Sequence, residues 1–223
     1  MIRLRHVAKV YSVGTLRVPA LSDVSFTIER GEFVVLSGPS GAGKTTLLRL
    51  LYADERPTEG EIEVAGLDLV GVKRRAIPRL RRSIGIVFQD AKLLSGRTVY
   101  ENVAFVLRVL GTPRSDVTPR AFAALKAVGL SARAQAYPAQ LSQGEAQRAS
   151  LARAIVKAPA LLLADEPTGN LDEEMADEIF ALLKDIWTRG TTVLFATHQA
   201  ALAARLKRRT LTLRDGRIVK DEG

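Results

Sequence analysis

The sequence GPSGAGKT at residues 38–45 has the residue types and spacing of a loop that binds phosphate groups. It matches the pattern G-x-x-x-x-G-K-[ST], in which glycines let backbone N–H groups converge on phosphate oxygens at the start of a helix. Lys44 adds a positive charge, and the hydroxyl of Thr45 is a ligand for Mg²⁺. The alternative, a glycine-rich turn that contains a lysine by chance, is disfavoured because an apolar segment precedes the loop and a helical pattern follows it. The residues predicted to contact a nucleotide here are Gly38, Pro39, Ser40, Gly41, Ala42, Gly43, Lys44, Thr45 and Thr46.

Two adjacent carboxylates, Asp165 and Glu166, follow the apolar segment at residues 161–164. A buried strand that ends in this way places both carboxylates at the carboxyl edge of a sheet, where the ligands of open α/β sheets bind. Asp165 is predicted to hold Mg²⁺, and Glu166 to orient or deprotonate an attacking water molecule. The alternative is an acidic strand end or a surface pair, but the loop at residues 38–45 favours the catalytic interpretation.

Three single residues are weaker candidates. Gln89 and His198 each follow an apolar strand pattern, so both are predicted to lie near a terminal phosphate. The alternatives are a polar surface glutamine and a histidine that only forms structural hydrogen bonds. Tyr11 either stacks on an adenine ring or packs against a small sheet.

The sequence LSQGE at residues 141–145 predicts the start of a helix and raises the question of a second anion site there. Ser142 and Glu145 have the spacing of a capping box, and a well-capped helix is the simplest interpretation. A capping box does not require Gly144, because glycine costs stability in a first turn. Glycine also lets another molecule approach the backbone closely, so an anion-binding role for Ser142 and Gly144 stays open.

Strands alternate with helices along the chain. Short apolar segments at 32–37, 161–165 and 191–197 indicate buried parallel strands. The segments at 24–32 and 60–69 indicate half-exposed antiparallel strands, which would form a smaller sheet beside the core. The region from about 98 to 155 is mainly helical and lies between two core strands, which indicates an inserted helical subdomain.

Composition excludes several classes of protein. The 223 residues, 47% of them hydrophobic and 26% charged, suffice for one sizeable domain or one core with subdomains. We expect a cytoplasmic protein, because no apolar run approaches the ~20 residues that span a bilayer and the amino terminus lacks a signal-peptide pattern. The absence of cysteine excludes disulfides, thiolate metal sites and cysteine nucleophiles, and two histidines make a histidine-rich metal site improbable.

The net charge of +9 suggests an anionic partner without requiring one. Basic residues are concentrated at 72–82 and 205–209, but neither stretch interleaves aromatic residues as a single-strand binder would. We interpret both as solvated faces, with attraction to a membrane surface ahead of nucleic acid as the functional alternative.

Six elements occur in the order found in ATP-binding cassette (ABC) ATPases: the phosphate loop, Gln89, LSQGE, LLLADE, NLD at residues 170–172, and His198. The resemblance covers essentially the whole chain. It implies an α/β P-loop NTPase fold with a mostly parallel core sheet, an antiparallel β subdomain and an inserted helical subdomain. The implied organisation is one nucleotide-binding domain over residues 1–223, with a signature-bearing helical region at about 90–157.

The resemblance also implies roles for individual residues and a partner. In this family two nucleotide domains meet head to tail, and the signature helix of one copy caps the ATP held by the other. Ser142 and Gly144 would then contact the terminal phosphate of a partner's ATP. The roles implied elsewhere are adenine stacking for Tyr11, magnesium and water sensing for Gln89, metal binding for Asp165, general base for Glu166, the switch histidine for His198, and communication across the dimer for Asp172.

One residue departs from the family pattern. Gln143 occupies the position of the first glycine in the usual L-S-G-G signature. Because Ser142 and Gly144 remain, we expect the dimer still to close on ATP. The added side chain of Gln143 leaves open how tightly the signature binds the nucleotide and how fast ATP is hydrolysed.

Within the family, EPTGNLD resembles a bacterial group that includes the lipoprotein-release, macrolide-export and cell-division ATPases, and the segment at 84–105 resembles the cell-division ATPases more particularly. That resemblance implies an integral membrane partner, control of cell-wall hydrolysis, and a peripheral location on the cytoplasmic face of the bacterial plasma membrane. It also implies docking of a short partner helix near residues 98–110. Val103, Val106 or Leu107, and Leu110 share one face there, which is either ordinary core or part of the docking groove, with aromatic contacts from Tyr100 or Phe105.

Two alternatives remain from other groups of the family. One is an ATPase of a lipoprotein-release or macrolide-export transporter. The other is a soluble DNA-associated ATPase, supported only by the basic charge. DNA-repair relatives carry a long coiled-coil insertion between phosphate loop and signature, and this chain has no sustained heptads in that interval, so we expect no nucleic-acid partner.

Overall fold

The computed structural model describes residues 1–223, apart from the side chain of Val13. The chain forms two compact units. Unit 1 contains residues 1–81 and 192–223, and unit 2 contains residues 82–191. The two units divide the predicted site residues between them, so each unit is described separately.

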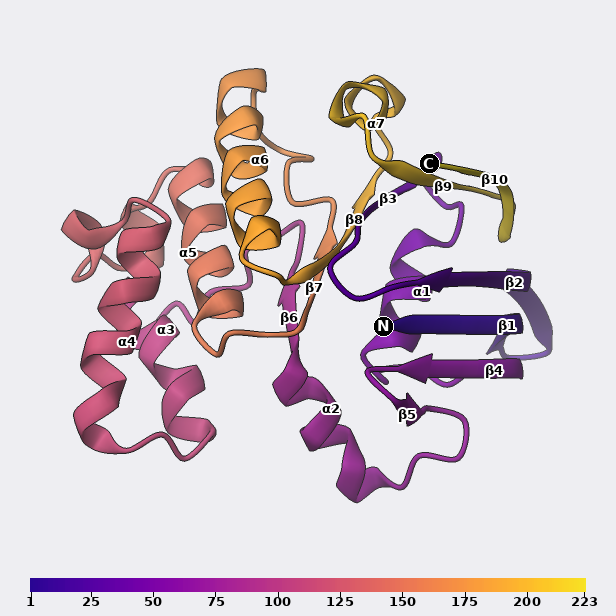
Figure 1. Cartoon of the computed structure of the whole chain (residues 1–223), viewed down its shortest axis with the longest axis horizontal. Coiled ribbons are helices and arrows are strands. Elements are labelled where there is room, and N and C mark those ends of the chain that lie inside the picture. Colours follow the sequence, from indigo (N-terminus) through magenta and orange to yellow (C-terminus); the bar gives the residue numbers. More distant parts are fainter. The chain divides into compact units, whose positions relative to one another are not determined.

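The first part of unit 1 forms a four-stranded antiparallel sheet. Its strands, in the order β2-β1-β4-β5 (Figure 1), are β1 (Ile2–Val13), β2 (Leu16–Ile28), β4 (Glu59–Val64) and β5 (Leu67–Asp68). Val24, Phe26 and Ile28 of β2 are buried, as are Ile62 and Val64 of β4. This alternation is typical of a sheet with one solvated face, so the predicted half-exposed strands are confirmed.

The rest of unit 1 is built on buried parallel strands. The strand β3 (Phe33–Ser37) lies between β8 (Thr192–Thr197) and β9 (Arg209–Arg214) and is parallel to both, while β10 (Arg217–Glu222) is antiparallel to β9. Every residue of β3 and β8 is buried, which explains their continuous apolar sequences and confirms both predicted strands. The helices of this unit are α1 (Lys44–Leu51) and α7 (Ala200–Leu206), and α2 (Ile77–Ser83) leads across the boundary into unit 2.

The basic stretch at 205–209 contributes to the fold of unit 1. The guanidinium of Arg209 donates two hydrogen bonds of 2.8 Å to the carboxylate of Asp221 on β10. It also donates to the carboxylate of Glu32 at 3.1 Å and to the carbonyl of Thr27 at 2.9 Å. Arg209 therefore joins three segments of the unit, and the interpretation of this stretch as a solvated face is wrong at that residue.

Unit 2 combines two parallel strands with four helices. The strands β6 (Ile84–Val87) and β7 (Leu161–Asp165) pair directly. The helices are α3 (Val99–Val109), α4 (Arg114–Ala127), α5 (Gln143–Ile155) and α6 (Glu173–Thr188). The helices α3, α4 and α5 pack against one another, and α5 also packs on β6 (Figure 1). The predicted helical region at about 90–157 lies within unit 2, and a single nucleotide-binding domain over the whole chain stays a prediction.

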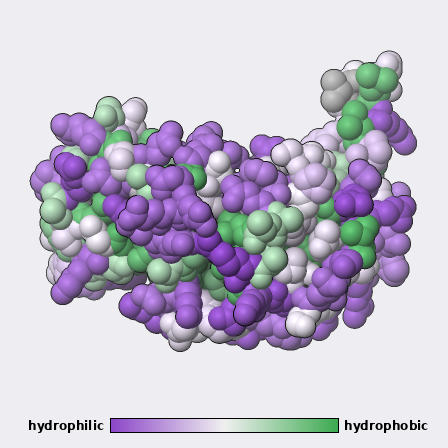
Figure 2. Space-filling view, turned by 90° about the horizontal axis from the view of Figure 1, so that it is seen from above, coloured by the Kyte–Doolittle hydropathy of each residue, from purple (hydrophilic) through white to green (hydrophobic). Residues whose placement is uncertain are grey.

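The surface is predominantly hydrophilic on the face shown in Figure 2, with small and scattered hydrophobic areas. Within the part of the chain that the structure describes, no helix is long and apolar enough to cross a membrane.

Candidate nucleotide-binding site

The phosphate loop, residues 38–45, connects β3 to α1 in unit 1. Two of its glycines are required by packing, because a Cβ on Gly38 would lie 2.1 Å from the carbonyl oxygen of Leu213 and one on Gly43 would lie 2.6 Å from that of Ala20. Gly41 differs, since its φ of 78° favours glycine but no atom lies within 4 Å of the Cβ position. The loop is therefore fixed to the core on one side and open at Gly41.

Lys44 is the first residue of α1 and is buried. Its ammonium donates hydrogen bonds to the carbonyls of Gly38 at 2.8 Å and Pro39 at 3.0 Å. A buried ammonium needs such acceptors, because desolvating a charge without hydrogen bonds is costly. The loop thus concentrates a positive charge and the amino terminus of α1 in one place, which suits a polyphosphate.

His198 lies near the start of the phosphate loop in unit 1. Ser37, the last residue of β3, pairs with Thr197, the last residue of β8, and the N–H of Gly38 donates to the Thr197 carbonyl at 3.3 Å. Gly38 and His198 therefore leave the same edge of two neighbouring strands, as the sequence predicted. Tyr11 lies on β1, with the Lys9 ammonium 4.8 Å from its ring centroid, and adenine stacking by Tyr11 stays a prediction.

In unit 2, Gln89 and the two carboxylates follow neighbouring strands. Val87 of β6 pairs with Ala164 of β7, so the chain passes into Gln89 and into Asp165 and Glu166 at one edge. Glu166 has a φ of 47°, in the left-handed region that costs a non-glycine residue about 1 kcal/mol. Eight other non-glycine residues in the described part of the chain also have a positive φ, so this conformation positions Glu166 without by itself marking a functional site.

Gln89 also contacts the chain that follows Glu166. A Cβ on Gly169 would lie 3.1 Å from Nε2 of Gln89, so that side chain lies directly against the turn after the carboxylates. The N–H of Gly169 closes this turn by donating to the Glu166 carbonyl at 3.0 Å. A pocket of about 210 Å³ here is lined mainly by amide and apolar side chains, including Gln89, Gln143, Gln147, Asn170 and Leu171.

The signature segment, residues 141–145, begins α5 with the predicted capping box. The hydroxyl of Ser142 accepts from the N–H of Glu145 at 3.2 Å, and the N–H of Ser142 donates to the Glu145 carboxylate at 2.9 Å. This bond from the Ser142 backbone, together with the Arg133 guanidinium 2.8 Å away, lowers the pKa of the Glu145 carboxyl. The helix-capping interpretation is confirmed, and anion binding by Ser142 stays a prediction.

Gly144 and Asp172 have structural roles that sequence reasoning missed. A Cβ on Gly144 would lie 3.1 Å from the sulfur of Met175, so glycine lets the start of α5 approach α6. Asp172 caps α6 by accepting from the N–H of Met175 at 2.8 Å. Aspartate at the N-cap position, followed by Glu173 and Glu174 in the first turn, signals the cap, but no local signal predicts the contact between Gly144 and Met175.

The donor groups predicted for Mg²⁺ fit that ion. They are the hydroxyl of Thr45, the amide of Gln89 and the carboxylate of Asp165, all oxygen donors of the kind that Mg²⁺ prefers. Among the described residues no cluster of three or more His, Cys, Asp or Glu side chains is placed to hold a metal. That is expected for Mg²⁺, which usually binds one or two carboxylates and otherwise substrate phosphates and water.

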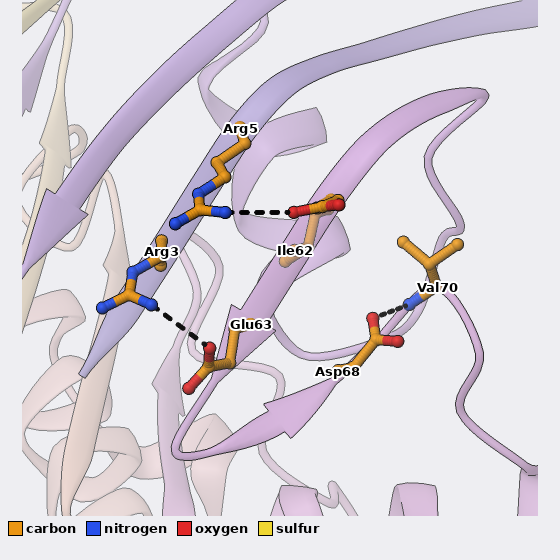
Figure 3. Close-up of a pocket in the computed structure, with 7 residues that line it drawn as sticks. Arg3, Arg5, Ile62, Glu63, Asp68 and Val70 are labelled. Atoms are coloured by element: carbon orange, nitrogen blue, oxygen red, sulfur yellow. Dashed lines mark hydrogen bonds and ion pairs between the residues drawn. The ribbon is translucent and has the colours of Figure 1, made fainter.

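A second hollow, of about 370 Å³, lies on the antiparallel sheet of unit 1 and contains none of the predicted site residues (Figure 3). Arg3 and Arg5 of β1 pair there with Glu63 at 3.8 Å and Glu61 at 3.7 Å on β4. Exposed pairs of this kind contribute about 1 kcal/mol at most, and they hold strands together without forming a recognisable reaction centre.

Comparison with known proteins identifies the class. The ABC transporter family matches residues 21–169. The structure described as "Dimeric Structure of MJ0796, a Bacterial ABC Transporter Cassette" is 36% identical, with a TM-score of 0.90 over 100% of this chain and 98% of that chain. A second structure, of "a post-hydrolysis state of the ATP-binding cassette MJ0796 bound to ADP and Pi", is 35% identical with the same score and coverage. The chain therefore belongs to the ABC transporter family, and the predicted α/β fold and ATPase class are confirmed.

Relatives that match over nearly their full length show a group of the family to which this chain is similar. The "Cell division ATP-binding protein FtsE" of Bacillus subtilis strain 168 is 47% identical over 222 residues, which cover 100% of this chain and 96% of the relative. The protein of the same name from Escherichia coli K12 is 48% identical over 218 residues, which cover 98% of this chain and 97% of the relative. The predicted resemblance to cell-division ATPases is confirmed.

Proposed function

We propose that this chain binds ATP with Mg²⁺ through its phosphate loop and hydrolyses it to ADP and phosphate. The strongest support is the loop itself, where Lys44 lies among the loop carbonyls and Gly41 is open to a ligand. The first experiment is a direct titration of the purified chain with ATP and with adenosine, each with and without Mg²⁺. Tight binding that requires the triphosphate supports the proposal, whereas equal binding of ATP and adenosine contradicts it.

The side chains of the site have separate tasks in this proposal. Glu166 accepts the proton of the attacking water, and Gln89 and His198 orient that water and the terminal phosphate. Thr45 and Asp165 hold Mg²⁺, which supplies charge neutralisation on the phosphate oxygens when it is bound. Tyr11 stacks on the adenine ring.

A second copy of the chain completes the proposed site. The two related cassettes described as dimeric support a homodimer, and one of them is described with ADP and Pi. In the proposed head-to-tail dimer, Ser142 and Gly144 of one copy contact the terminal phosphate bound by the other. ATP binding closes the dimer and hydrolysis reopens it.

The proposed docking surface for a membrane subunit lies between α3 and α4. A hollow of about 590 Å³ is lined by Tyr100, Arg108, Thr112, Arg114, Val117 and Thr118. Val109 is 64% exposed and Phe105 is 36% exposed, while Val103 and Leu107 are buried in the core. The exposed side chains and the hollow suit a short amphipathic helix with acidic residues, since two arginines line the hollow and no acidic side chain does.

The membrane partner is, in this proposal, a protein of the FtsX type, and the complex controls cell-wall hydrolysis during division. The support comes from full-length relatives named as cell-division ATP-binding proteins. The chain then works at the cytoplasmic face of the bacterial plasma membrane. Affinity purification from native membranes tests this, because recovery of a lipoprotein-release or macrolide-export protein in place of an FtsX-type protein would contradict it.

A further inference from the structure

We name residues 88–92 the Gln89 segment. Side chains of helix α5 hold this segment by donating hydrogen bonds to the segment's backbone carbonyls. The side-chain amide of Gln147 donates to the carbonyl of Phe88 at 2.9 Å. The guanidinium of Arg153 donates to the carbonyls of Ala91 at 2.8 Å and Lys92 at 2.6 Å. Three bonds from one helix therefore fix both ends of a five-residue segment.

Partial burial makes two of these bonds, from Gln147 to the Phe88 carbonyl and from Arg153 to the Ala91 carbonyl, hard to exchange for bonds to water. Gln147 is only 3% exposed. Burial also lowers the pKa of Arg153, which stays charged because the guanidinium group does not deprotonate in proteins. Within the described residues, the guanidinium of Arg153 donates to the carbonyls of Ala91 and Lys92 and forms no ion pair. Arg153 is half-buried, so water replaces these acceptors only in part when they are lost, and this favours the Gln89 segment staying against α5.

The conformation of the segment supports the same view. Lys92 has a φ of 48°, and its ammonium lies 4.1 Å from the ring centroid of Phe88. The segment thus folds back on itself, with Gln89 between the fixed carbonyls and its side chain against Gly169. Where Gln89 lies is set by α5 as well as by β6.

We infer that Gln147 and Arg153 are positioning residues for ATP hydrolysis, acting through Gln89. The inference rests on the proposed function, in which Gln89 helps to orient the attacking water and the terminal phosphate. The helix α5 then carries the signature residues Ser142 and Gly144 at its start. It holds the Gln89 segment through Gln147 about one turn later and Arg153 about three turns later. A displacement of α5 at its signature end is transmitted to Gln89, so closure on a partner's nucleotide and the alignment of Gln89 are coupled.

A double-mutant cycle separates positioning from a merely structural contact. Gln147→Leu keeps the volume and removes the donor. With Gln89 intact, we expect the substitution to lower kcat about tenfold while ATP affinity changes less than about twofold. In a Gln89→Ala background the same substitution should lower kcat less than about twofold, because the group through which it acts is gone. Arg153→Lys, which keeps the charge and one donor direction, should retain more activity than Arg153→Met.

Arg120→Met is the matched control. Arg120 also donates to a backbone carbonyl of the α5 region, that of Val156 at 3.3 Å, but it does not touch the Gln89 segment. Its turnover should stay within about twofold of the parent. Equal losses from Gln147→Leu in both backgrounds would overturn the inference, as would an unchanged kcat with Gln89 intact.

Hydrogen exchange distinguishes failure of the inference from failure of the proposed function. Amides of residues 89–94 should exchange at least about tenfold faster in Gln147→Leu and at the parental rate in Arg120→Met. A parent without turnover, or a Gln89→Ala variant with full turnover, would contradict the proposed function. Whatever the turnover results, an unchanged exchange rate in Gln147→Leu would show that α5 does not hold the Gln89 segment in place.

Discussion

The phosphate loop and the signature segment each lie at the start of a helix, but their residues differ in the contacts they make within the chain. At the phosphate loop, Gly41 faces open space and Lys44 places an ammonium among loop carbonyls. At the signature segment, the side chain of Ser142 already caps α5 and Gly144 already packs against Met175. The loop has open space for a ligand at Gly41, whereas Ser142 and Gly144 have roles within their own chain.

This comparison separates the residues whose identity is explained by contacts within one chain from the features that indicate a bound ligand. Packing accounts for Gly38 and Gly43 and a positive φ accounts for Gly41, so what indicates a ligand at the loop is the open space at Gly41 beside the buried charge of Lys44. Capping and packing account for Ser142, Glu145 and Gly144 without any ligand. Evidence for anion binding at the signature segment must therefore come from a second molecule.

The largest effect is expected from Glu166→Gln, which tests whether unit 2 supplies the base for a phosphate held by unit 1. The amide keeps the size of the carboxylate but cannot accept the proton, so turnover should fall about a thousandfold. ATP binding should persist, and size-exclusion chromatography with ATP and Mg²⁺ should show a dimer. Parental turnover, or only monomer under these conditions, would remove Glu166 from that role.

Lys44→Ala tests the phosphate side of the comparison. The backbone dipoles of the loop cannot replace the ammonium, so ATP affinity should fall about a hundredfold or more in a direct titration. Lys184→Ala, at an exposed lysine of α6, is the control and should bind ATP like the parent. Unchanged affinity in Lys44→Ala would refute the assigned contact.

Gly144→Ala tests whether the signature backbone must be approached from outside the chain. The added methyl group would meet only the flexible end of Met175, so unfolding free energy should drop by about 1 kcal/mol or less. The ATP-dependent dimer should weaken by a larger factor, about tenfold in its dissociation constant, because in the proposed dimer Gly144 contacts the terminal phosphate bound by the partner. Parallel losses of stability and dimer affinity would favour packing as the only role of Gly144.

The smallest effect concerns the capping box itself. The pKa of Glu145 lies below its ordinary value of 4.5 in the folded chain, so this carboxylate stabilises the fold above that pH and loses its effect as pH falls through the lowered pKa. Glu145→Gln keeps an acceptor for the N–H of Ser142 and should cost about 0.5 kcal/mol at neutral pH. Urea titrations at pH 7 and pH 4 should show a smaller acid-induced loss in the variant than in the parent. An identical pH dependence would mean that Glu145 does not contribute.

Local patterns predicted the elements well. Continuous apolar runs identified β3, β7 and β8, and the capping box at Ser142 identified the start of α5. Strand ends also predicted that Gln89 and Asp165 leave one edge of unit 2, since parallel pairing follows from the alternation of strands and helices.

Contacts between distant residues were not predictable in the same way. Arg153 binds carbonyls about sixty residues earlier in the chain, and Arg209 binds Asp221 on a strand without a strong hydrophobic pattern. Gly144 suggested an external ligand because no short-range rule reveals Met175 beside it. Such contacts depend on tertiary packing and leave no periodic signal in the sequence.

Thiol cross-linking is the most direct test of the central claim, that the signature of one copy acts on the nucleotide of another. The chain has no native cysteine, and Ser40 and Ser142 are both exposed. Variants with Ser40→Cys or Ser142→Cys, each with Glu166→Gln to prevent reopening, are mixed with a short bifunctional reagent. Gln143→Cys serves as a second probe that leaves the cap intact. The account predicts a cross-link between the mixed chains that strengthens with ATP and Mg²⁺, whereas cross-linking found only within a single chain carrying both cysteines would contradict it.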